Sequence, residues 1–292
     1  MTDANGQESD SGPYGGAVDA RPGGALGGVS RVRTRHLQET KDAGERFAML
    51  TAYDAMTAGI FDEAGIDVLL VGDSAGSTVF GESTTLPVTL EQMILLTRAV
   101  SRAARRALVV VDVPFGSYEE SPEQAVRTAV RLMKEGGAHA VKIEAGAALA
   151  PQVAAVVRAG IPVMGHIGFT PQSEHALGGY RIQGRGEAAQ RVVDDALAVQ
   201  EAGAFAVLLE MVPPATAADV EAALDVPTVG IGAGASTTGQ VLVWQDALGL
   251  GDGRVPRFVK QYAQLRSVVA EAAGRYAREV RDGSFPGPEH AY

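Results

Sequence analysis

The stretch Val68-Leu69-Leu70-Val71-Gly72-Asp73-Ser74 joins four apolar residues to an acid and a hydroxyl. Consecutive apolar residues are typical of a strand buried on both faces, as in a parallel sheet covered by helices. Three later stretches repeat the pattern, with an acid at or near the carboxyl end: VVVD (109–112), AVKIE (140–144) and AVLLE (206–210). Buried strands that each deliver an acid to the tip indicate a charged edge on the sheet.

Helical segments alternate with these strands, and many of them end in glycine, which suits the left-handed residue after a helix. Predicted strands cover 47–53, 68–71, 108–114, 140–144, 162–167, 206–212, 227–231 and an apolar run at 240–248. Predicted helices cover 34–43, 55–64, 90–104, 149–158, 187–201, 215–224 and 256–281, and another begins at Ser121-Pro122. Eight such units over about 260 residues predict an α/β fold, a (β/α)8 TIM barrel with a short N-terminal helix and C-terminal helices.

A doubly wound open sheet is the alternative fold. That fold normally binds nucleotides through a glycine-rich turn after its first strand, and Tyr53-Asp54-Ala55-Met56 contains no glycine.

Residues 1–29 are rich in Gly, Asp, Ser and Pro and predict a disordered tail. Residues 30–292 are predicted to form a single catalytic barrel domain.

The composition excludes several classes of function. A net charge of −10 disfavours nucleic acid as a partner, because phosphate binding needs a basic surface. No apolar run reaches the about 20 residues that span a bilayer, so no membrane association is expected. The chain has no cysteine, which excludes disulfides and thiolate chemistry and fits a cytoplasmic location.

In a barrel, the four strand-end acids gather at the carboxyl face, where active sites lie. They are Asp73, Asp112, Glu144 and Glu210. Clustered carboxylates need a neutralising cation, and oxygen ligands favour a hard ion such as Mg²⁺. Mg²⁺ usually takes only one or two carboxylates from the protein, so at least one acid should have another role.

Lys142 lies two residues before Glu144, so both side chains point to the same face of their strand, into the barrel mouth. A lysine there can hold a substrate carboxylate or balance an acid. His166, at another strand end, is interpreted as either a structural histidine or a catalyst. Residues 178–186 predict a mobile lid. The glycines of 230–234 resemble a phosphate-binding loop, but a tight turn is the preferred interpretation.

These motifs together resemble the ketopantoate hydroxymethyltransferase family. The similar stretches, in the same order, are LTAYD (50–54), VGDS (71–74), TLPVT (85–89), DVPFGSY (112–118), VKIE (141–144), GHIGFTPQS (165–173), GGYRIQGRG (178–186), LLEMVP (208–213) and GIGAG (230–234). The resemblance implies a Mg²⁺-dependent enzyme of pantothenate biosynthesis. It would add the one-carbon unit of 5,10-methylenetetrahydrofolate to 3-methyl-2-oxobutanoate and give 2-dehydropantoate.

The resemblance also implies roles for individual residues. Asp73 and Asp112 would bind the metal, and Glu144 would complete its site directly or through water. Asp73, Ser74, Asp112 and Lys142 would contact the substrate, and Glu210 would be the base that removes the C3 proton. The family further implies a homo-oligomer, often a decamer.

The chain departs from the family near its eighth strand. Thr238 replaces an Asp before Gly-Gln, and Gln245 replaces a His before Asp, which puts the folate contacts there in question. Two alternatives stay open: a Mg²⁺-dependent lyase or aldolase acting on another 2-oxo acid, and a catalytically inactive barrel used for binding.

Overall fold

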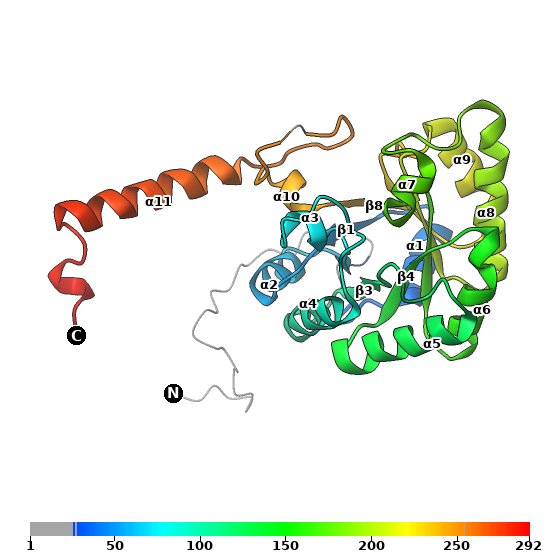
Figure 1. The fold of residues 1–292 in the computed structure, drawn as a ribbon, viewed down its shortest axis with the longest axis horizontal. Helices are drawn as coiled ribbons and strands as arrows, with labels where there is room; N and C mark the ends of the chain where they lie inside the picture. Colours follow the sequence, from blue (N-terminus) through cyan, green and yellow to red (C-terminus); the bar gives the residue numbers. More distant parts are fainter. Residues whose placement is uncertain (1–25, 27, 254) are drawn as a thin grey trace.

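The computed structural model describes residues 26, 28–253 and 255–292. Eight parallel strands close into a barrel in sequence order, with helices around the outside (Figure 1). The strands are β1 Phe47–Thr51, β2 Val68–Val71, β3 Leu108–Asp112, β4 Ala140–Glu144, β5 Val163–Gly168, β6 Ala206–Glu210, β7 Thr228–Ile231 and β8 Gly239–Leu242. The predicted (β/α)8 barrel is confirmed.

The helices follow the strands in the order expected of a barrel. The α-helices are α1 Thr34–Asp42, α2 Ala55–Glu63, α3 Ala75–Thr78, α4 Leu90–Ala103, α5 Pro122–Arg131, α6 Ala150–Arg158, α7 Glu174–Leu177, α8 Ala189–Glu201, α9 Pro214–Ala223, α10 Trp244–Ala247 and α11 Leu265–Asp282. Shorter or wider turns are η1 Leu132–Gly136, η2 Ala147–Leu149, η3 Pro171–Ser173, η4 Gly186–Ala188 and η5 Pro288–His290.

Side-chain caps set the starts of three helices. The Asp54 carboxylate accepts hydrogen bonds from the backbone N–H groups of Met56 and Thr57 at the start of α2. Thr89 and Ser121 cap α4 and α5 in the same way, each accepting from the backbone N–H three residues further on. Each cap satisfies a backbone N–H that has no partner within the helix.

Two apolar clusters support the barrel. One fills the barrel interior with side chains such as Met49, Val110 and Leu208, and the other packs the helices against the outside of the sheet. The strands β2, β3 and β4 are buried at every residue, because side chains pointing inward and outward both meet apolar neighbours. This double burial explains the consecutive apolar residues of β2 and β3, whereas Asp112, Lys142 and Glu144 are buried polar residues near the carboxyl end of the barrel.

Two predicted elements near the C-terminus are wrong in extent. The run 240–248 is not one strand, because β8 ends at Leu242 and α10 begins at Trp244. The helix predicted over 256–281 begins only at Leu265, and the residues before it follow an irregular path. Helix α11 then projects away from the barrel (Figure 1), and none of its residues is buried.

The first described residues contact the barrel. Leu26 is buried, and its carbonyl oxygen accepts a hydrogen bond of 2.7 Å from Nη2 of Arg106. Residues 1–25 and 27 of the predicted 1–29 tail lie outside the described residues, so the division of the chain at residue 29 stays a prediction. Among the described helices, none is long and apolar enough to cross a membrane.

Candidate active site

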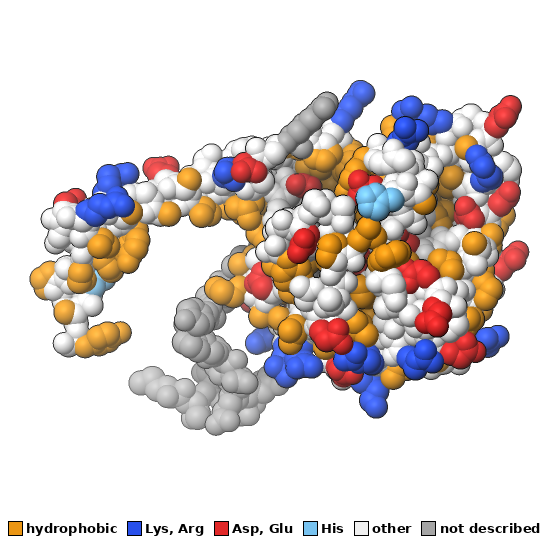
Figure 2. Space-filling model, viewed as in Figure 1, with side chains coloured by type: hydrophobic (Ala, Val, Ile, Leu, Met, Phe, Trp, Pro, Cys, Tyr) orange, Lys and Arg blue, Asp and Glu red, His pale blue; other side chains and the backbone are white. Residues whose placement is uncertain are grey.

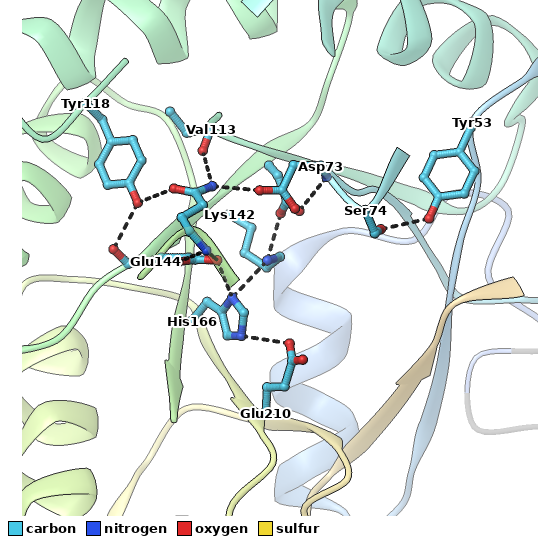
Figure 3. Close-up of polar contacts among 11 residues, drawn as sticks. Tyr53, Asp73, Ser74, Val113, Tyr118, Lys142, Glu144, His166 and Glu210 are labelled. Atoms are coloured by element: carbon cyan, nitrogen blue, oxygen red, sulfur yellow. Dashed lines mark hydrogen bonds and ion pairs between the residues drawn. The ribbon is translucent and has the colours of Figure 1, made fainter. Parts of the chain in front are cut away.

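A cavity of about 310 Å³ lies at the carboxyl ends of the barrel strands. Its polar lining includes most of the residues that the sequence singled out: Asp73, Ser74, Asp112, Lys142, His166 and Glu210. These side chains come from five different strands or strand ends, and they converge because parallel strands deliver their carboxyl ends to one face. Figure 3 shows Asp73, Lys142, His166 and Glu210 close to one another in this region.

Asp73, Asp112 and Lys142 form a buried charged group. The register pairs Asp112 of β3 with Lys142 of β4, and Oδ1 of Asp112 lies 2.9 Å from Nζ of Lys142. The backbone N–H of Asp73 donates to Oδ2 of Asp112 at 3.0 Å. Two acids therefore share one lysine in a cavity from which most water is removed.

Burial and mutual repulsion change the pKa values of this group. Burial and the neighbouring Asp112 raise the pKa of Asp73 from 3.8 to about 7. Burial alone would lower the pKa of Lys142, but Asp112, Asp73 and Glu144 together raise it to about 12. Lys142 is therefore charged at neutral pH, and Asp73 ionises less readily than an exposed aspartate.

His166 links the lysine to Glu210 on the opposite side of the cavity. Nδ1 of His166 lies 3.2 Å from Nζ of Lys142, and because Lys142 only donates, Nδ1 accepts and Nε2 carries the hydrogen. Nε2 lies 3.3 Å from Oε2 of Glu210, outside hydrogen-bond geometry. Burial and Lys142 lower the pKa of His166 well below its usual value, so the ring is neutral.

Burial raises the pKa of Glu210 from 4.5 to about 7, with Lys142 opposing the shift and Asp112 adding to it.

The residue after Glu210, Met211, has a φ of 49°. A residue with a side chain rarely adopts this left-handed conformation, which costs about 1–2 kcal/mol. Met211 is held there because its N–H donates to Ile231 and its carbonyl accepts from Gln183 in the predicted lid segment.

Glu144 is buried beside the cavity but does not line it in the described structure. Both of its carboxylate oxygens accept from the backbone N–H of Gln172, at 3.1 and 3.3 Å. Burial and the charge of Asp73 raise its pKa well above 4.5. The sequence interpretation missed Gln172, although the residue stands in the quoted motif GHIGFTPQS.

Two tyrosines border the cavity region. The hydroxyl of Tyr53 lies 2.8 Å from Oγ of Ser74, so either oxygen is the donor (Figure 3). Tyr180 comes from the segment 178–186 and lines the cavity, with its ring 4.7 Å from that of Phe169. This position fits a segment that covers the site, and its movement as a lid stays a prediction.

Gly168 is the last residue of β5, pairs with Glu210 of β6 and has a φ of 91°. A Cβ atom here would lie 2.4 Å from the backbone oxygen of Glu210. We expect Gly168→Ala to lower the free energy of unfolding by roughly 1–3 kcal/mol more than the control Gly160→Ala. Gly160 has a similar φ of 85° with open space around it, so both variants carry the same backbone strain. Thermal unfolding of both variants measures the difference, and equal losses would mean that the contact with Glu210 is harmless.

The donor set fits a divalent ion held by two aspartates. Oδ1 of Asp112 is buried, and Nζ of Lys142 lies 2.9 Å from it. A carboxylate has about four lone-pair sites, so Asp112 can pair with the ammonium and still face a cation. No three His, Cys, Asp or Glu side chains stand close enough together to hold an ion in the region that the structure describes. Two carboxylates are nevertheless a normal protein contribution to a Mg²⁺ site.

The two departures near β8 lie in different places. Thr238 precedes the strand, and its hydroxyl donates to Glu221 at 2.8 Å on the amino-terminal side of the barrel, away from the cavity. Thr238 does not line the cavity, and the effect of this departure on folate contacts stays a prediction. Gln245 lies in α10 beside Asp246, which lines the cavity, and it is buried.

Residues 31–288 match the family described as ketopantoate hydroxymethyltransferase. The chain belongs to the ketopantoate hydroxymethyltransferase family. It is 64% identical over 284 residues to a 3-methyl-2-oxobutanoate hydroxymethyltransferase of Paenarthrobacter aurescens (strain TC1), with 96% of this chain and 94% of the relative covered. It is 67% identical over 264 residues to the protein of that name from Arthrobacter sp. (strain FB24), with 90% and 88% covered. Membership makes the chain an enzyme, a hydroxymethyltransferase.

Solved structures of other enzymes share the barrel of this family member. A phosphonopyruvate hydrolase superposes with a TM-score of 0.58 at 16% identity, covering 89% of this chain and 91% of the other. A 2,3-dimethylmalate lyase superposes with a TM-score of 0.56 at 17% identity, with the same coverage. At this identity the likeness concerns the fold alone.

Proposed function

We propose that the chain transfers the one-carbon unit of 5,10-methylenetetrahydrofolate to 3-methyl-2-oxobutanoate and produces 2-dehydropantoate for pantothenate biosynthesis. Family membership and the names of the relatives support this reaction. The observation that carries it is the cavity in which Asp73, Asp112, Lys142 and Glu210 converge. Such a group can hold a small 2-oxo acid and remove a proton next to its keto group.

Asp73 and Asp112 are the residues that would hold Mg²⁺, and Glu144 would act through a water molecule because its oxygens face Gln172. When bound, Mg²⁺ would act as a Lewis acid that draws electrons from the keto oxygen of the substrate. The raised pKa of Asp73 supports this assignment, since a carboxylate that resists ionisation beside another acid gains most from a nearby cation.

Lys142 and Ser74 are proposed to orient the substrate, together with Asp73 and Asp112. The Lys142 ammonium keeps its charge inside the cavity and is a donor for the carboxylate of a 2-oxo acid. The Ser74 hydroxyl lines the same cavity, and Tyr53 limits its rotation. A substrate held at two points presents its C3 atom in a defined direction, which lowers the entropy cost of the reaction.

Glu210 is the proposed general base. Its pKa of about 7 lies near neutral pH, where a carboxylate is both available and basic enough to accept a proton from carbon. The neutral His166 ring lies beside it, with Nε2 3.3 Å from Oε2, and adds no charge. After C3 gives its proton to Glu210, the resulting carbanion forms a C–C bond to the one-carbon unit. Both C–N bonds of that carbon break, water supplies the hydroxyl group, and tetrahydrofolate leaves with the proton that remains from the water and the proton that Glu210 returns.

A product assay tests the reaction as a whole. The purified protein with 3-methyl-2-oxobutanoate, 5,10-methylenetetrahydrofolate and Mg²⁺ should form 2-dehydropantoate, detected by mass spectrometry. Product without the folate, or none with all components, would overturn the proposed reaction.

A cytoplasmic location is proposed as well, since a chain without cysteine needs no oxidising compartment.

Exchange of the C3 proton should depend on pH through Glu210. Only the carboxylate form accepts a proton, so the rate should rise as pH passes about 7 and level off above it. NMR in D₂O between about pH 5.5 and 9, with saturating Mg²⁺ and 3-methyl-2-oxobutanoate, measures the profile. A rate that falls across this range would argue that a protonated group performs the step.

We also propose that copies of the chain associate, up to the decamer implied by the family resemblance. Helix α11 supports this, because it extends from the barrel with an apolar stripe formed by Val269, Tyr276 and Val280 (Figure 2). Their spacing of seven and four residues places them on one side of a helix. Apolar side chains on a helix without a packed face gain free energy when a partner covers them.

Light scattering coupled to gel filtration tests the association. The double variant Val269→Glu with Val280→Glu should have a lower molar mass than the unmodified protein, because charge is placed in the stripe. The control Arg275→Ala alters an exposed charge on the same helix and should leave the mass unchanged. A monomeric unmodified protein, or a double variant of unchanged mass, would contradict the role of α11.

A further inference from the structure

Gln172 is buried, and both polar atoms of its side-chain amide have hydrogen-bond partners close to the acids of the site. Its Nε2 donates to Oδ2 of Asp73 at 2.8 Å and to the carbonyl oxygen of Val113 at 3.0 Å. Its Oε1 accepts from the hydroxyl of Tyr118 at 2.7 Å (Figure 3). Its backbone N–H donates to the carboxylate of Glu144. One residue therefore touches two of the three acids assigned to the metal.

The orientation of this amide is determined by its neighbours. The Val113 carbonyl can only accept, so it must face the NH₂ end of the amide. The Tyr118 hydroxyl lies on the other side and gives its proton to Oε1; its second contact, to the carbonyl oxygen of Glu144, is longer at 3.3 Å. The amide cannot turn over without losing a hydrogen bond at both ends, which is costly in a buried site.

This fixed amide constrains Asp73. A carboxylate with two free oxygens can rotate, whereas Oδ2 of Asp73 is tied to Gln172. Oδ1 is then the oxygen left for another partner. Groups that hold a ligand in one orientation raise metal affinity because the free site is already arranged. The backbone N–H of Gln172 likewise limits the rotation of the Glu144 carboxylate, because it donates to both carboxylate oxygens.

We propose that Gln172 is a positioning residue, oriented by Tyr118, that holds Asp73 and Glu144 ready for a divalent cation. The inference rests on the proposed metal site. Gln172 lies 99 positions from Asp73 in the chain and comes from the turn η3 after β5, so it joins strands that are not neighbours in sequence. It does not line the cavity, and its effect on the reaction would pass entirely through the acids that it contacts.

The variant Gln172→Met tests the role, because methionine has a similar length and fills space without a donor. Calorimetric titration with MgCl₂ in the presence of 3-methyl-2-oxobutanoate should show a loss of affinity of about 10–100-fold, as for other partners of metal ligands. Tyr118→Phe should lose less, since the amide stays in place. The control Gln190→Met changes an exposed glutamine on α8 and should keep the affinity of the unmodified protein.

A double-variant cycle separates positioning from general support of the fold. If Tyr118 acts through Gln172, then Tyr118→Phe should add nothing to the loss of Mg²⁺ affinity in the Gln172→Met background. Additive losses would overturn the relay between the two residues. Unchanged Mg²⁺ affinity in Gln172→Met, with only a lower melting temperature of the metal-free protein, would show that the residue merely supports the structure.

The unmodified protein distinguishes this inference from the proposed function. If it binds no Mg²⁺, the proposed metal site fails, and the positioning role fails with it. If it binds Mg²⁺ and Gln172→Met binds equally well, the metal site stands and only the role of Gln172 is overturned.

Discussion

Glu210→Gln is expected to reduce C3 proton exchange from 3-methyl-2-oxobutanoate by about 10²–10⁴-fold, the usual cost of losing a general base. The amide has nearly the same size as the carboxylate but cannot take a proton from carbon. Binding of Mg²⁺ and the 2-oxo acid should be largely retained, because Glu210 lies beside His166 and apart from Asp73 (Figure 3). A loss of exchange without a loss of binding identifies a base.

Two measurements on the same variant decide this result. Loss of the C3 proton signal in D₂O follows the exchange, and calorimetry with Mg²⁺ follows the binding. The control Glu201→Gln changes an exposed glutamate at the end of α8 and should behave as the unmodified protein. Normal exchange in Glu210→Gln would mean that another group is the base, with His166 as the next candidate. Loss of Mg²⁺ or 2-oxo acid binding would mean that Glu210 contacts the substrate or the metal instead.

Asp73→Asn and Asp112→Asn are each expected to weaken Mg²⁺ binding by more than the roughly 10–100-fold that loss of an outer partner costs. Asparagine keeps the shape of the side chain and removes the charge that the cation needs. Asp112→Asn should also weaken the hold on Lys142, since the ammonium loses its nearest carboxylate at 2.9 Å. Titration calorimetry with MgCl₂ and 3-methyl-2-oxobutanoate measures both effects.

The melting temperature of the metal-free variants shows whether a loss of Mg²⁺ affinity comes from the metal site or from a damaged fold. Folding raises the pKa of Asp73 from 3.8 to about 7, so the stability associated with this carboxyl is full below 3.8 and is lost as pH rises through about 7. At pH 8 the metal-free protein carries this penalty and Asp73→Asn does not, so the variant should melt no lower than the unmodified protein. Asp219→Asn, on the exposed side of α9, is the control. Unchanged Mg²⁺ affinity in both active-site variants would remove the metal assignment.

The sequence predicted the barrel because its strands are apolar at consecutive positions. Val109, Val110 and Val111 have no exposed surface in the structure, as a strand between a filled interior and a layer of helices requires. The same reasoning predicted that Asp73, Asp112, Lys142 and Glu210 would meet at one face. Parallel strands point the same way, so residues at their carboxyl ends converge whatever their separation in sequence.

Other features could not be predicted from local pattern. The run 240–248 is mostly apolar, and its pairing with β1 and β7 ends at Leu242, after which a helix follows. Thr238 and Gln245 stand close together in the sequence, yet Thr238 precedes β8 at the amino-terminal end of the barrel, whereas Gln245 lies beyond the carboxyl end of that strand. Gln172 has no hydrophobic period or charge that would single it out.

The sequence by itself determined the alternation of strands and helices, the caps that start α2, α4 and α5, and the acids at the strand tips. Each depends on residues a few positions apart, where side-chain periodicity and backbone hydrogen bonding act directly. Only the tertiary structure decided that Glu144 faces Gln172 and that His166 stands between Lys142 and Glu210. It also decided the pKa values of Asp73 and Glu210. Burial and charge–charge distance set these properties, and both depend on residues brought together from distant parts of the chain when the barrel closes.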